Sequence, residues 1–291
     1  SKAFGGAEIQ EIVLLQPEPQ QAIEQESEEI TPIVELKKQD EKEIKKKTNS
    51  RLKKPRKGGA VTVTLDPRDI METMEFPFLA LSKKRTDPII YESKDGKTKI
   101  QISAHRGHYV ASIYDWDIIQ LISGKIQEVI NSGSDVPPRT MIIARQKLIK
   151  SLHKHSGKTT EKEIEAALSR LKSTLIETSV RNEDRKYDCF GWLDSWGYTE
   201  RKDIKEFRIT LSQWLYDGIC RKGSLLKVRP EYFRITSGLK KFLYRTARKH
   251  VGNHNQSWDF LIETLHEKSG SEQEFKKFKY DLKKAVSDND I

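Results

Sequence analysis

Residues 139–196 place helical and strand-like patterns in an order that few folds share. Apolar residues recur at helical spacing over 139–157 and again over 160–174, and a short polar turn separates these two segments. Two alternating segments, 175–181 and 189–196, follow around the polar loop NEDRKYD. A pair of helices joined by a tight turn and followed by a β-hairpin is typical of a winged helix.

The segments before this succession supply the remaining elements of such a domain. The stretch KTKIQISAHRGHYVASIYD at 97–115 alternates, which predicts a β-hairpin with HRGH as its turn. Asp115 is a favourable N-cap for a following helix of about four turns. Gly157 stands where a C′ glycine would end the helix over 139–157. The sequence therefore predicts a helix in front of the helix pair.

A similar order returns near the C-terminus. Segments 238–252, 257–270 and 271–286 each carry apolar residues at helical spacing. The third helix of each set opens with an S/T-x-x-E pair, the signature of a capping box, and these pairs are Thr160–Glu163 and Ser271–Glu274. We therefore expect a second helix-turn-helix.

The domain organisation follows from these patterns and from charge. Residues 1–36 hold eight Glu and one Lys, whereas residues 37–57 hold eleven Lys or Arg and three acids. With few aromatic residues and no long periodic pattern, this part of the chain is typical of a disordered tail. We expect an α+β chain with two tandem winged-helix (helix-turn-helix) domains, divided into a tail at 1–58, a first domain at 59–223 and a second at 224–291.

The stretch GLKKFLYRTARKHVG at 238–252 carries only basic residues on its polar face. A polar face that only keeps a helix in solution usually mixes its charges. Residues 224–291 hold fourteen Lys or Arg against nine acids, and the chain has a formal net charge of +10. A solvated face remains one explanation, but two basic helices in one small domain favour contact with the phosphates of duplex DNA.

The expected DNA contacts are polar and basic residues on the third helix of each set, on the first wing and on the basic helix at 238–252. Lys and Arg would mostly hold phosphates, while Ser and Tyr could contact phosphates or bases. In the first domain these residues are Lys158, Thr159, Lys162, Ser169, Arg170 and Lys172, with Arg181, Arg185 and Lys186 on the wing. In the second domain they are Arg245, Arg248, Lys249, Ser269, Ser271, Lys276, Lys277, Tyr280, Lys283 and Lys284.

Patterns for other chemistry are missing from the sequence. No GxxxxGK[ST] or G-x-S-x-G motif occurs, and the histidine pairs lack the Cys or acidic partners of a metal site. Two cysteines cannot form a disulfide framework, and no apolar run is long enough to span a membrane. We expect a cytoplasmic protein that is not an enzyme and uses no cofactor or metal.

Three stretches together resemble the bacterial plasmid replication initiator protein A family. They are FPFLALSKKRTDPIIYES at 76–93, SLHKHSGKTTEKEIEAALSRLKSTLIETSVR at 151–181 and SGLKKFLYRTARKHVG at 237–252. The resemblance runs from about residue 70 to 286. It implies a two-domain winged-helix initiator that binds repeats at a plasmid origin, helps to open the DNA and recruits host helicase-loading machinery.

The resemblance also implies where DNA is read and what else binds. By position, the DNA-reading helices would be 160–173 and 271–286. Members of that family extend further, so a second wing is expected beyond Ile291. The expected partners are double-stranded origin DNA, host replication proteins such as a helicase or initiator, and a second copy of the chain in a dimer.

Two other functions remain open at this point. A winged-helix transcriptional regulator would bind a single operator and load no helicase. A scaffold whose winged helices bind protein would lack salt-dependent DNA binding.

Overall fold

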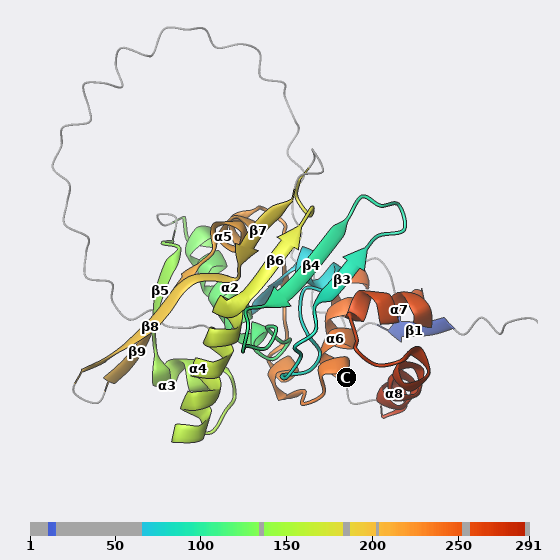
Figure 1. Ribbon diagram of the computed structural model, residues 1–291. Helices are drawn as coiled ribbons and strands as arrows, with labels where there is room; N and C mark the ends of the chain where they lie inside the picture. Colours follow the sequence, from blue (N-terminus) through green and yellow to red (C-terminus); the bar gives the residue numbers. More distant parts are fainter. Residues whose placement is uncertain are drawn as a thin grey trace, which may run out of the picture. The chain divides into compact units, whose positions relative to one another are not determined.

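The computed structural model describes residues 11–15, 66–133, 137–182, 187–201, 204–251 and 257–288 (Figure 1). All of these residues belong to one compact unit. Helices and antiparallel sheets are mixed along the chain, as expected for the α+β class.

The middle of the chain contains a helix, a strand, two helices and a long hairpin. These are α2 (Trp116–Asn131), β5 (Thr140–Ala144), α3 (Arg145–Ser151), α4 (Lys158–Ser173), β8 (Leu193–Arg201) and β9 (Ile204–Leu211). The three strands form one antiparallel sheet in the order β5-β9-β8. The predicted helices after Asp115 and over 160–174 are confirmed.

A second sheet combines two strands that precede α2 with two strands that follow α4. It contains β3 (Ile89–Glu92), β4 (Lys99–Ala104), β6 (Thr174–Thr178) and β7 (Asp188–Gly191), in the order β3-β4-β6-β7. The predicted hairpin over 175–181 and 189–196 therefore exists as β6–β7, but it belongs to this four-stranded sheet. The hairpin that pairs with β5 is β8–β9, which the sequence patterns missed.

The hairpin predicted over 97–115 is partly wrong. Its turn is present, since the backbone N–H of His108 donates to the carbonyl of His105 at 2.9 Å. Gly107 has φ +85°, a conformation that glycine adopts without strain. However, β4 pairs with β3 and β6 on its two sides, and residues 110–113 form no strand.

Two predicted helices begin as strands. Residues 140–144 form β5, in which Met141 and Ile143 alternate into the core while β9 supplies the hydrogen-bonding partners. Residues 257–261 likewise form a strand before a helix. A short strand followed at once by a helix keeps apolar residues at spacings that mimic one longer helix, which explains both errors.

The predicted caps also differ from the structure. α3 ends at Ser151, and Gly157 is the N-cap of α4 rather than a C′ glycine. Thr160 donates to the carbonyl of His155, and Glu163 pairs with Lys154 at 2.5 Å, so no capping box forms there. The second box is absent too, because α8 begins after its N-cap Glu274.

The C-terminal part repeats the order helix, strand, helix, helix. These elements are α6 (Gly238–His250), β11 (Ser257–Leu261), α7 (Ile262–Ser269) and α8 (Phe275–Ser287). The antiparallel partner of β11 is β1 (Glu11–Leu15), which lies inside the predicted tail, so five residues of that segment form a strand. The rest of the predicted tail lies outside the described residues.

Short elements connect these parts. They are β2 (Arg68–Ile70), α1 (Met71–Glu75), α5 (Gln213–Cys220), β10 (Leu225–Lys227) and the 3-10 helix η2 (Pro230–Arg234). β2 pairs with β10, so the start and the later part of the described chain meet in one small sheet.

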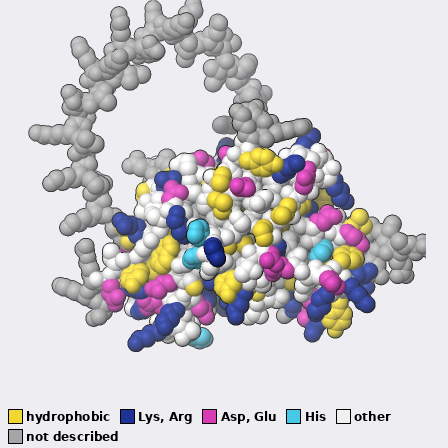
Figure 2. Space-filling model, viewed as in Figure 1, with side chains coloured by type: hydrophobic (Ala, Val, Ile, Leu, Met, Phe, Trp, Pro, Cys, Tyr) yellow, Lys and Arg dark blue, Asp and Glu magenta, His cyan; other side chains and the backbone are white. Residues whose placement is uncertain are grey.

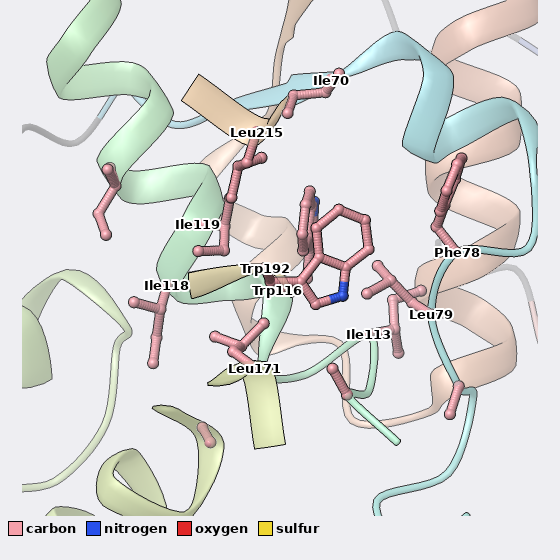
Figure 3. Packing of buried hydrophobic residues seen from close by; sticks show 14 of the residues in the cluster. Ile70, Phe78, Leu79, Ile113, Trp116, Ile118, Ile119, Leu171, Trp192 and Leu215 are labelled. Carbon is pink, nitrogen blue, oxygen red and sulfur yellow. The ribbon is translucent and has the colours of Figure 1, made fainter. Parts of the chain in front are cut away.

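The core of the described residues is one continuous cluster of buried apolar side chains. At its centre the rings of Trp116 and Trp192 lie 4.8 Å apart, and Phe78 packs against Trp192 at 5.8 Å (Figure 3). The cluster extends from Ile70 to Ala285 and so includes residues of both predicted domains. The boundary between those domains therefore stays a prediction.

Candidate nucleic-acid interface

The basic face of α6 is largely turned toward acidic residues of the N-terminal half. Arg245 is 4% exposed, and its Nε donates to Asp69 Oδ2 at 2.7 Å. Its terminal nitrogen also donates to the carbonyl of Thr73 at 2.8 Å. Arg245 therefore cannot contact DNA from the surface, and its assignment as a DNA contact is wrong.

Lys241, on the same helix, forms a second buried ion pair. Its Nζ lies 2.8 Å and 2.9 Å from the two carboxylate oxygens of Asp117, and it sits 3.9 Å from the centre of the Tyr232 ring. Burial raises the pKa of the Asp117 carboxyl to about 6, although Lys241 acts in the opposite direction. Burial likewise lowers the pKa of the Lys241 ammonium.

A third contact of α6 gathers three basic side chains around one carboxylate. Lys249, Lys268 and the Nε2 atom of His250 all lie at Glu75, the last at 3.0 Å. Burial raises the pKa of the Glu75 carboxyl, but these three groups outweigh burial and hold that pKa well below its usual range. Lys249 is thus engaged within the protein, and its assignment as a DNA contact stays a prediction.

The remaining predicted contact on α6 is Arg248. Its Nε donates to the carbonyl of Lys227 at 3.0 Å at an exposed position. Asp69, Asp117 and Glu75 therefore neutralise most of the basic face of α6.

On α4 the predicted residues divide into two groups. Arg170 is turned inward, and its Nε and terminal nitrogen donate to Asp115 at 2.9 Å and 2.7 Å, so its assignment to DNA stays a prediction. Ser169 is half-buried. The exposed members are Lys158, Thr159, Lys162 and Lys172.

The acidic residues of α4 are neutralised from neighbouring elements. Glu161 accepts from Arg145 at 2.6 Å and also pairs with Lys205 of β9. Hydrogen bonds from Lys205 and Arg145 lower the pKa of the Glu161 carboxyl. Lys205 pairs with Glu165 as well, at 2.7 Å. The exposed lysines of α4 therefore dominate the charge of its outer face.

Arg181, the predicted wing residue in the described part of the chain, lies against Glu72 and Trp214. Arg181 makes two hydrogen bonds to Glu72, at 2.9 Å and 2.6 Å, and its guanidinium stacks 3.7 Å over the ring of Trp214. Gly218 leaves room for this guanidinium, since a Cβ there would lie 2.1 Å from it. The assignment of Arg181 to DNA stays a prediction, and Arg185 and Lys186 lie outside the described residues.

On α8 nearly all the predicted residues are accessible. Tyr280 is 64% exposed, and Lys277 pairs with Asp281 at 2.6 Å one turn along the helix. Ser271 is half-buried. Ser269 is buried and donates to the carbonyl of His266, so its assignment to DNA is wrong. The other exposed members are Lys276, Lys283 and Lys284.

Lys and Arg side chains gather at one end of α4 and around α8 on the face shown in Figure 2. Between them, His side chains lie near the centre of this face (Figure 2). The β8–β9 hairpin adds exposed Tyr198 and Arg208 beside α4. These two residues were missed because the sequence patterns paired segment 189–196 with 175–181, whereas β8 pairs with β9.

None of the helices in the described residues has the length and apolar character needed to cross a bilayer. The two cysteines are both free thiols, with Cys189 exposed and Cys220 half-buried.

Comparison with solved structures shows a known fold. The chain superposes on a selenomethionine derivative of domain 2 and domain 3 of RctB with a TM-score of 0.53 at 10% identity, covering 74% of this chain and 82% of that one. A second structure of RctB domains 2-3 gives a TM-score of 0.51 at 12% identity, covering 75% and 82%.

Comparison of sequences shows the family. A protein from Wigglesworthia glossinidia brevipalpis, whose name gives it an inferred role as a replication protein, is 30% identical over 258 residues, covering 87% of this chain and 92% of that protein. The Replication initiator protein A family matches residues 68–291, which confirms the resemblance seen in the sequence. The chain therefore belongs to the Replication initiator protein A family.

Proposed function

We propose that this replication initiator binds double-stranded DNA at origin repeats through the outer faces of α4 and α8. The proposal rests on the charges of the side chains of α4. Lys162 and Lys172 are exposed and, among the described residues, have no carboxylate within ion-pair distance. The acids of the same helix are already neutralised by Arg145, Lys154 and Lys205.

The element order supports a winged-helix mode of binding. In such domains the third helix enters the major groove, which is about 12 Å wide, and the wing contacts the adjacent backbone. α4 is that third helix and has 16 residues, a length of about 24 Å. The hairpin β8–β9 pairs with β5 as a wing does. α6, β11, α7 and α8 repeat the helical part of this arrangement with α8 as the third helix.

We infer the remaining parts of the proposal from what the family resemblance implies and from the motifs that the sequence lacks. The chain acts in the cytoplasm without catalysis, a cofactor or a metal, and helps to open the origin through binding and DNA bending energy or host ATPases. It recruits host replication proteins such as a helicase, and it associates with a second copy. A transcriptional regulator is the alternative, and several direct repeats beside an AT-rich stretch near the gene would favour the initiator.

The salt dependence of DNA binding tests this proposal. With about 6 to 10 phosphate contacts, the slope of log affinity against log salt concentration is expected to be roughly −5 to −9. Lys162→Ala should weaken binding and, if Lys162 holds a phosphate, make that slope shallower by about one. Fluorescence anisotropy with a labelled duplex at several salt concentrations measures both quantities.

Lys94→Ala is the matched control for this titration. Lys94 is exposed in the turn between β3 and β4, at the opposite end of β4 from the HRGH turn at 105–108. Its removal also subtracts one surface charge, but affinity should stay close to that of the wild type. A wild-type protein whose affinity does not depend on salt would overturn the DNA-binding proposal.

A further inference from the structure

A pocket lies where the HRGH turn meets the C-terminal end of α4 and the start of β8. Its volume is about 590 Å³. Its polar and aromatic lining side chains include His105, His108, Ser169, Lys172, Ser173 and Trp196. Apart from Ser169 and Lys172, none of them was among the predicted DNA contacts.

The turn is held firmly against α4. The backbone N–H of His105 donates to the carbonyl of Ser173, the last residue of α4, at 2.9 Å. The rings of His105 and His108 lie 6.2 Å apart, one on each side of Arg106 and Gly107. The hydrogen bond from His105 to Ser173 places the turn beside the C-terminal end of α4.

The chemistry of the pocket favours an anion. Its lining includes an ammonium, two imidazoles and four hydroxyls, and it contains no carboxylate. Arg106 projects from the same turn as an exposed side chain, and among the described residues no ion pair involves it. In Figure 2 the His side chains near the centre of the displayed face lie beside a Lys or Arg side chain. Such a set can hold a phosphate through charge-assisted hydrogen bonds.

We propose that this pocket, together with Arg106, holds a backbone phosphate of the duplex that α4 enters. The inference rests on the proposed function. A helix in the major groove has a phosphate backbone along each side of the groove, and the pocket lies beside the outer face of α4 at its C-terminal end. The turn thereby fixes the position of α4 along the groove, a role that phosphate contacts commonly have.

The test compares Arg106→Ala and Lys94→Ala in the full chain, with a labelled duplex and a salt titration. Each variant removes one exposed charge, and the two residues lie beyond opposite ends of β4. Arg106→Ala should weaken binding by about 3- to 10-fold and make the salt slope shallower by about 0.9, the amount lost with one phosphate contact. Lys94→Ala should leave both values unchanged. Ethylation interference should show one phosphate whose modification blocks binding of the wild type but not of Arg106→Ala.

The outcomes separate this inference from the proposed function. If the wild type binds with a steep salt slope and Lys162→Ala weakens it, but Arg106→Ala behaves as Lys94→Ala does, then the phosphate pocket is refuted and DNA binding by α4 stands. If the wild type shows no salt-dependent binding, the proposed function itself fails. The double variant His105→Gln/His108→Gln, which keeps polar side chains in the turn, should also weaken binding, and wild-type affinity in that protein would count against the pocket.

Discussion

Arg245→Ala is expected to lower the free energy of unfolding by about 3–5 kcal/mol, the usual cost of removing one partner from a buried ion pair. Arg245 and Asp69 are 4% and 1% exposed. In the variant, Asp69 would keep its hydrogen bonds from Trp116 and Gln120, at 2.8 Å and 2.7 Å, but would lose the guanidinium that balances its charge. Urea unfolding followed by circular dichroism measures the loss.

Arg248→Ala is the control for that experiment, since Arg248 lies on the same helix, three residues further on. Its hydrogen bond to Lys227 is at an exposed position, so its loss should cost less than about 1 kcal/mol. Assayed well below its unfolding midpoint, Arg245→Ala should also keep wild-type DNA affinity. Equal stability of the two variants would show that the Arg245–Asp69 pair does not hold α6 to the N-terminal half.

Phe278→Ala should destabilise the protein by about 3–5 kcal/mol, because a large core side chain is removed and a cavity remains. Phe278 is fully buried on the inner face of α8 and packs against the ring of His266 at 4.7 Å. The loss of this contact should release α8 from α7. Thermal unfolding of the variant measures the effect.

Tyr280→Ala, two residues further along α8, should give the opposite pattern. Tyr280 is 64% exposed, and a surface substitution of this kind usually changes stability by less than about 0.5 kcal/mol. If α8 reads bases, the affinity gap between specific and random DNA should narrow by about 1–3 kcal/mol. A Tyr280→Ala protein that melts as early as Phe278→Ala would show that this face of α8 is structural.

The helices could be predicted from local periodicity, but the residues that contact them from distant parts of the chain could not. The apolar stripe of α6 correctly located a helix at 238–250. The basic side chains of this helix pair with distant acids. Arg245 pairs with Asp69, 176 residues away in the sequence, and Lys241 pairs with Asp117, 124 residues away. No local pattern in the sequence indicates these distant partners, so Arg245 and Lys249 were predicted to contact DNA.

The strands were harder to predict because their partners are distant in sequence. β4 pairs with β6 across α2, β5, α3 and α4, so the predicted local hairpin partner for β4 was wrong. The predicted wing hairpin, β6–β7, belongs to the sheet of β4. The hairpin that pairs with β5 is β8–β9. On α4 and α8, in contrast, the outer positions follow from helical spacing alone, and most residues predicted there are exposed.

The outer face of α4 is expected to take part in selecting DNA sequence. Selection of bound molecules from a pool of randomised duplexes, followed by sequencing, tests this claim and does not require the origin sequence. The wild type should enrich one repeat motif, Arg248→Ala should enrich the same motif, and Thr159→Ala/Ser169→Ala should lose preference at part of it. A wild type that enriches no motif, or an α4 variant that enriches the motif unchanged, would contradict sequence selection by the outer face of α4.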